Sequence, residues 1–182
     1  MTNNVRNLCL HEVEETERFT KTKSPKGVYV WGYQVDRSFI PLYVGKSRNI
    51  FERIIQHYCR FSGGEYIIPN TVFFDKAPTA DYSIDISKCF IPTDLASIYS
   101  MLNNPTNTFQ KNKQHIISNF KFTYLKIDDK DGKAKREIAE KYLSNKIGKE
   151  RLISSVPLLD TMPDYELMNL IDTAFSKYYK PA

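Results

Sequence analysis

Two neighbouring segments of the chain, 27–35 and 39–45, alternate apolar and polar side chains with a period of two. This period is typical of a β-strand that buries one of its faces. In the first segment, Val28 and Tyr29 point to opposite faces of the strand. In the second, Tyr43 points to the face opposite that of Leu42 and Val44, which flank it. A short polar stretch separates the two segments, so we predict a β-hairpin. If the valine face packs on the core, Tyr29 and Tyr43 share the other face.

The pattern changes to helical spacing immediately after the second strand. Isoleucines, a phenylalanine and a tyrosine recur at intervals of three and four residues. We therefore predict a helix over residues 48–59, with Ser47 as its N-cap. Arg53 and His57 lie one turn apart on the polar side of this helix. The strand pair, a turn at Gly45 and the basic helix are expected to surround one pocket.

A third strand and a second amphipathic helix are predicted over residues 120–127 and 131–148. On the helix, Glu140 borders the apolar arc, whereas Glu137 points away from it. We expect Glu140 to border a buried site and Glu137 to face water. The plainer interpretation of Glu140 is an exposed helix charge balanced by Arg136.

The hydrophobic pattern predicts a single domain made of several parts. These are a core over residues 24–58 and 120–160, an insertion over 59–119, an N-terminal extension over 1–23 and a C-terminal helix over 164–178.

Three smaller elements are expected within the insertion, and one in the N-terminal extension. Residues 66–74 have the composition of an extended segment, residues 92–102 that of a short helix, and residues 103–113 that of a polar loop. We expect the N-terminal extension to be partly helical over residues 5–19.

Composition limits the class of protein. The chain has 182 residues, of which 41% are hydrophobic, which is sufficient for one core. The formal net charge of +5 and the isoelectric point near 9.0 suit a polyanionic partner, although proteins that bind no nucleic acid also reach such values. Three cysteines and no long apolar run lead us to expect a cytoplasmic protein without a membrane span.

Two other kinds of site are disfavoured by residue spacing. Cys9, Cys59 and Cys89 are too scattered to hold zinc. The sequence Gly45-Lys46-Ser47 resembles the end of a phosphate-binding loop, but that loop needs a glycine at the position of Ile40.

The residues singled out above form a spaced set that resembles the signature of the GIY-YIG nucleases. Taken one at a time, a tyrosine on a strand is more often a packing residue, and a basic pair on a helix is more often solvated. Their combination at these spacings favours the family. The matching segments are Gly27-Val28-Tyr29 and Tyr43-Val44-Gly45-Lys46, followed by Arg53, His57 and the family glutamate at Glu140.

The resemblance implies a small α+β fold, a three-stranded antiparallel sheet flanked by helices. It also implies one divalent metal ion, Mg²⁺ or Mn²⁺, held mainly by Glu140 and water, and hydrolysis of a nucleic-acid phosphodiester without a covalent enzyme intermediate. Tyr29 would orient or deprotonate the attacking water, directly or through His57. Tyr43 and Lys46 would position the water and the phosphate, and Arg53 would stabilise the phosphate charge.

The expected function is therefore that of a metal-dependent DNA endonuclease acting on double-stranded DNA, with a type II restriction endonuclease as the subtype that best fits a stand-alone chain. The enzymatic alternative is a structure-specific or repair nuclease of the same fold. The alternative from another class is a nucleic-acid-binding module that does not cut. One active site cuts one strand at a time, so a duplex break would need a homodimer or two successive visits.

Overall fold

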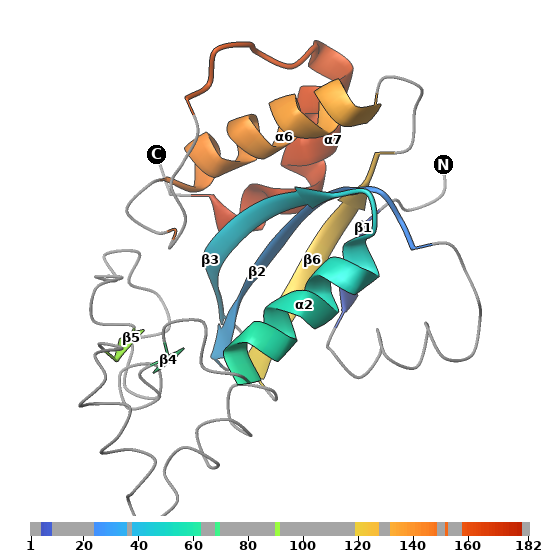
Figure 1. Ribbon diagram of the computed structural model, residues 1–182. Coiled ribbons are helices and arrows are strands. Elements are labelled where there is room, and N and C mark those ends of the chain that lie inside the picture. Colours follow the sequence, from blue (N-terminus) through green and yellow to red (C-terminus); the bar gives the residue numbers. More distant parts are fainter. Residues whose placement is uncertain are drawn as a thin grey trace, which may run out of the picture.

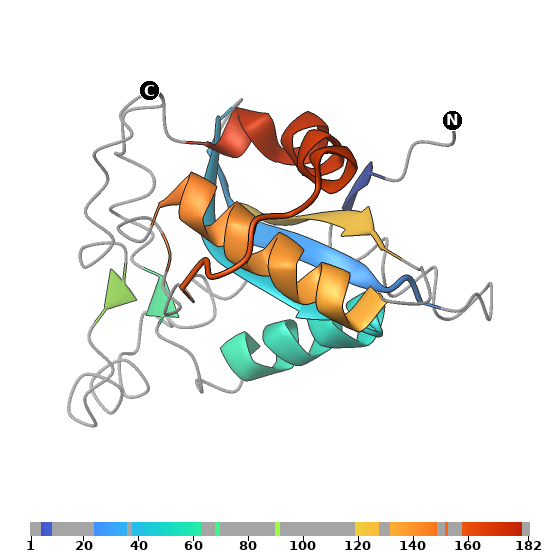
Figure 2. The ribbon, with the colours of Figure 1, turned by 90° about the horizontal axis from the view of Figure 1, so that it is seen from above.

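The molecule is an antiparallel sheet with helices on both faces, seen in the computed structural model of Figures 1 and 2. The structure describes residues 5–8, 24–35, 38–62, 68–69, 90–91, 119–127, 132–148, 152 and 158–179.

The main sheet contains four strands, which are β1 (Val5–Leu8), β2 (Gly27–Val35), β3 (Ser38–Ser47) and β6 (Phe120–Lys126). Their order is β1-β6-β2-β3, and every neighbouring pair is antiparallel. The predicted α+β class and the three-stranded core β6-β2-β3 are confirmed, and β3 forms one edge of the sheet.

The fourth strand corrects the prediction for the N-terminal extension. The segment that we expected to begin a helix is instead β1, which pairs with β6 from Val5↔Leu125 to Leu8↔Phe122. Without β1 the outer edge of β6 would lack backbone partners, and a ladder of hydrogen bonds satisfies them better than a weakly periodic helix could. The remainder of that expected helix, residues 9–19, lies outside the described residues.

The insertion contains a second, two-stranded sheet, formed by β4 (Ile68–Pro69) and β5 (Phe90–Ile91). β4 falls within the segment predicted to be extended. The short helix predicted over 92–102 and the polar loop over 103–113 lie outside the described residues.

Three of the predicted helices are confirmed, as α2 (Ile50–Ser62), α6 (Gly132–Ile147) and α7 (Tyr165–Phe175), the last continued by the 3₁₀ turn η3 (Ser176–Tyr178). None of the described helices has the length and apolar character needed to cross a membrane.

The predicted N-cap of α2 is wrong by two residues. Glu52 N–H donates to Asn49 Oδ1 at 3.0 Å, so Asn49 is the capping residue. Ser47 instead brackets Asn49, because its hydroxyl accepts from Asn49 N–H at 3.0 Å and donates to the Asn49 carbonyl at 2.8 Å. Both residue types cap helices well, and the turn geometry decides between them.

Each face of the sheet is covered by different helices. The valine face, with Val28, Val30 and Val44, packs against α6 and α7 in the main hydrophobic core. The opposite face carries Tyr29 and its neighbouring aromatic residues and packs against α2 (Figures 1 and 2). The prediction of one buried face is therefore too simple, since the start of β2 is buried on both sides.

A tyrosine–aspartate network fixes α6 against α7. Asp172 accepts hydrogen bonds from Tyr179 Oη at 2.6 Å and from Tyr142 Oη at 3.1 Å. Burial, followed by the hydrogen bond and the charge of Asp172, raises the pKa of Tyr179, so this phenol stays protonated at physiological pH. The network holds α6, the helix that carries Glu140, in a defined position relative to α7.

Candidate functional site

The aromatic cluster of Tyr29, Trp31, Tyr43 and His57 lies between the sheet and α2. Tyr29 Oη lies 2.7 Å from His57 Nε2, and both side chains are buried. The ring of His57 lies 5.0 Å from that of Tyr43, centroid to centroid. The two phenols that the motif predicted to share a face do so, because Tyr29 and Tyr43 both occupy the face that α2 covers.

Trp31 was not predicted as part of the site, yet its ring stacks on Tyr43 at 5.5 Å with an interplanar angle of 11°. Tyr43 in turn stacks on Tyr29 at 6.1 Å. The signal was present in the sequence, since Trp31 follows Tyr29 by two positions and so shares its face. Aromatic pairs of this kind contribute about 0.5–1.5 kcal/mol each beyond burial, so the stacked rings stabilise one another.

Gly45 makes room for the tyrosines. It pairs directly with Tyr29 across the two strands, and a Cβ built on it would lie 2.5 Å from Tyr29 Oη and 2.7 Å from Tyr43 Cε1. These distances are shorter than real carbon atoms tolerate, so one or both rings would have to move. The glycine of the motif therefore has a steric role in the site rather than a turn role.

We expect Gly45→Ala to lower the free energy of unfolding by about 1–3 kcal/mol, as overpacking usually does. It should also change the fluorescence of the folded protein, because Trp31 is the only tryptophan and stacks on Tyr43. Urea unfolding and emission spectra measure the two effects. Gly148→Ala is the control, since Gly148 has a φ of 99° and its replacement strains the backbone without changing emission. An unchanged spectrum for Gly45→Ala would contradict the steric role.

Arg53 lies on α2 one turn before His57, at the half-exposed rim of the aromatic cluster. Burial opposes its charge, but hydrogen bonds and electrostatic interaction with Tyr29 and then Tyr43 outweigh this and raise the pKa of Arg53. Its Nη1 also donates to Gln56 Oε1 at 3.0 Å. The guanidinium is therefore charged at any working pH and is held beside both phenols.

Lys46 and Glu140 form an ion pair between β3 and α6. The side chain of Glu140 is 18% exposed. The side chain of Glu137 is 45% exposed and lies 4.0 Å from Lys141, so the predicted difference in exposure between the two glutamates is confirmed. Arg136 is not the counter-ion of Glu140, because it is buried and donates to the carbonyl of Ile127 at 3.1 Å.

The structure divides the predicted site between the two faces of β3. Lys46 pairs with Val28 across the strands and so lies on the valine face, whereas Gly45 lies on the tyrosine face. The expected single pocket is thus replaced by the aromatic cluster with Arg53 on one face and the Lys46–Glu140 pair on the other. Gly45, which contacts the phenols, and Lys46 are nevertheless consecutive residues of β3, an edge strand of the sheet, so both groups adjoin the same end of that strand.

Glu140 can serve as a single carboxylate ligand of a hard divalent cation. Within the described part of the chain, no group of three or more histidine, cysteine, aspartate or glutamate residues could hold a metal ion. Mg²⁺ nevertheless needs only one or two carboxylates when water and a substrate phosphate supply the remaining oxygens. A single, partly exposed glutamate fits that mode of binding.

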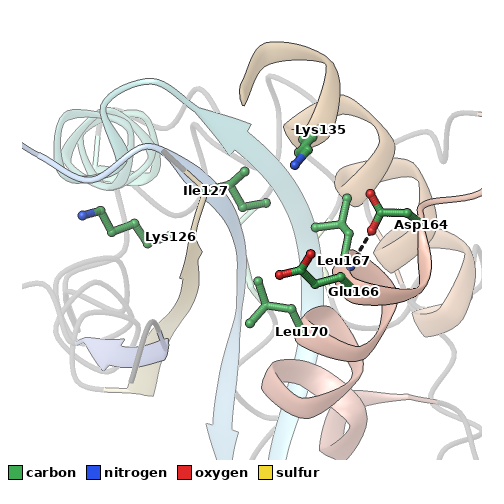
Figure 3. Close-up of a pocket in the computed structure, with 7 residues that line it drawn as sticks. All are labelled: Lys126, Ile127, Lys135, Asp164, Glu166, Leu167 and Leu170. Carbon is green, nitrogen blue, oxygen red and sulfur yellow. Dashed lines mark hydrogen bonds between the residues drawn. The ribbon is translucent and has the colours of Figure 1, made fainter. Parts of the chain in front are cut away.

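A pocket of about 200 Å³ opens elsewhere, between the end of β6, α6 and the start of α7 (Figure 3). It includes none of the predicted site residues. Its lining mixes two lysines, two carboxylates and apolar side chains, so it has no net attraction for phosphate. The residues are Lys126, Ile127, Lys135, Asp164, Glu166, Leu167 and Leu170.

No protein-family model, curated protein or solved structure matches this chain. We therefore infer function from the geometry of the residues at the rim of β3.

Proposed function

We propose that this protein is a divalent-metal-dependent endonuclease of the GIY-YIG type that hydrolyses phosphodiester bonds in DNA. The observation that supports the proposal best is that the Tyr29–His57 pair and the Lys46–Glu140 pair adjoin neighbouring positions of β3, with Arg53 one turn before His57 on α2. Two cations, two phenols, an imidazole and a carboxylate near one strand edge are the groups that phosphodiester hydrolysis requires.

The substrate phosphate binds at the rim of β3, because the exposed side chains lie there. Tyr43 and Arg53 are half-exposed and Lys46 is 37% exposed, so all three can reach a phosphate. Arg53 donates two parallel hydrogen bonds to the phosphate oxygens and stabilises the charge that grows on them in the transition state. Lys46 neutralises the same charge from the opposite face of the strand.

The buried pair Tyr29–His57 accepts the proton that the attacking water loses. His57 Nε2 lies within hydrogen-bond distance of Tyr29 Oη and can accept its proton. Arg53, beside the same phenol, stabilises negative charge that develops on the Tyr29 oxygen. Because Tyr29 is buried, its oxygen accepts the proton of the attacking water through the half-exposed Tyr43. The water oxygen bonds to phosphorus as the P–O bond to the leaving group breaks, and solvent protonates the departing alkoxide. When bound at Glu140, the divalent cation would act as a Lewis acid on the phosphate.

The subtype that we favour is a type II restriction endonuclease that cuts duplex DNA either as a homodimer or in two successive binding events. A structure-specific or repair nuclease is the enzymatic alternative. The Lys46–Glu140 ion pair favours a different candidate, a DNA-binding module without activity, if it serves only to hold α6 on β3. That candidate would bind DNA without a metal ion.

Incubation of the protein with supercoiled plasmid and linear DNA, with Mg²⁺, with Mn²⁺ or with chelator, tests the proposal. We expect metal-dependent cleavage that is lost in Tyr29→Phe, which removes the hydroxyl facing His57. Tyr165→Phe is the matched control, since Tyr165 is 80% exposed. Discrete fragments would support a restriction enzyme, and nicking or branched-substrate cleavage a structure-specific one. DNA binding without cleavage under every condition would reject the nuclease.

A further inference from the structure

In the proposed function Glu140 binds a divalent cation and Lys46 binds a phosphate. In the structure these two side chains instead form an ion pair with each other. It joins an edge strand to a helix 94 positions away in sequence, and each side chain supplies one charge. While the ion pair is formed, Glu140 Oε2 is occupied by the Lys46 ammonium, and the ammonium is not available to a phosphate. The pair therefore competes with both the cation and the substrate.

The two members of the pair differ in how easily they can move. Glu140 has a short side chain on α6, which is anchored by Leu143 in the core and by Tyr142 through Asp172. Lys46 has a long, flexible stem and is about twice as exposed as Glu140. When a divalent cation occupies the carboxylate, repulsion between like charges acts on the ammonium, and Lys46 is the group that moves.

We propose, resting on the proposed function, that Lys46 is an exchangeable counter-ion of Glu140. In the free protein Lys46 pairs with Glu140. When a divalent cation and a phosphodiester arrive together, Glu140 binds the cation and Lys46 moves to a phosphate oxygen, so every charge keeps a partner. Cation and DNA then bind cooperatively, each increasing the affinity for the other by the same factor.

The exchange predicts an effect that a purely structural ion pair does not. If Lys46 only clamps α6 to β3, its removal loosens α6 and leaves cation affinity unchanged or weaker. If Lys46 competes for Glu140, its removal strengthens cation binding in the absence of DNA. Lys141 provides the matched control, because it neighbours Glu140 in sequence but pairs with Asp160 at 2.9 Å.

Titration of Mn²⁺ without DNA, followed by electron paramagnetic resonance of the free ion, tests the exchange. We expect Lys46→Met to bind Mn²⁺ about five-fold more tightly than the unmodified protein, the scale of a partly exposed ion pair. Lys141→Met should change the affinity by less than about two-fold, because Lys141 is paired with Asp160 and its interaction with Glu140 is weaker than that with Asp160. Glu140→Gln should weaken binding.

A second measurement tests cooperativity. In the Tyr29→Phe background, which prevents cleavage, fluorescence anisotropy of a short labelled duplex is recorded with and without Mg²⁺. Mg²⁺ should tighten DNA binding when Lys46 is present and tighten it several-fold less in Lys46→Met.

The outcomes separate the exchange from the proposed function. If Glu140→Gln weakens Mn²⁺ binding but Lys46→Met leaves it unchanged or weaker, the exchange is wrong and the metal site stands. If Glu140→Gln binds Mn²⁺ as tightly as the unmodified protein, Glu140 is not a ligand, and both the exchange and the metal-dependent mechanism fail.

Discussion

Glu140→Gln is expected to lower the rate of DNA cleavage at least about 100-fold without unfolding the protein. Glutamine keeps the shape of the side chain but removes the charge that a divalent cation needs. The loss of the ion pair with Lys46 should cost the fold at most about 1 kcal/mol, since both side chains are partly exposed. Single-turnover cleavage and urea unfolding measure the two effects separately.

Glu137→Gln is the control for this prediction. Glu137 lies one turn earlier on the same helix, is 45% exposed and faces Lys141 at 4.0 Å. Its replacement changes the charge of α6 by the same amount, so we expect less than about a two-fold change in rate. Equal losses in the two variants would indicate a general electrostatic effect on DNA binding. Retained cleavage in Glu140→Gln would mean that the carboxylate has no direct role.

The positions of the two glutamates show what local periodicity can predict. A helical wheel depends only on the rise and turn of one helix, so it distinguishes Glu140 from Glu137 without any tertiary contact. The same applies to Tyr29 and Tyr43, whose shared face follows from a period of two and a hairpin register. The period of two also predicts the face on which Lys46 lies, because Lys46 follows Val44 by two residues and so shares the valine face.

The sequence did not predict how the elements assemble. Nothing in the periodicity of α2 or α6 states which face of the sheet each helix covers, and that choice divides the site between two faces. The pairing of β1 with β6 is also non-local, since its strands lie more than a hundred residues apart. Asn49 and Ser47 are equally good capping residues by type, and only the hydrogen bonds of the turn distinguish them.

Arg53→Lys is expected to lower the cleavage rate at least about 100-fold while changing DNA affinity by less than about three-fold. The reason is the number and geometry of the arginine's donors, because the planar guanidinium interacts with Tyr29 and then Tyr43 and still offers donors to a phosphate. A lysine keeps the positive charge that attracts DNA, but its compact ammonium cannot serve two phenols and a phosphate at once.

Arg48→Lys separates this geometric role from ordinary phosphate contact. Arg48 is an exposed arginine between β3 and α2, so lysine should replace it with little loss of rate or affinity. Single-turnover rates and anisotropy titrations of the two variants give the comparison. If Arg53→Lys cleaves within about ten-fold of the unmodified protein, Arg53 contributes charge alone, and the phenols must be organised by His57 and Gly45 without it.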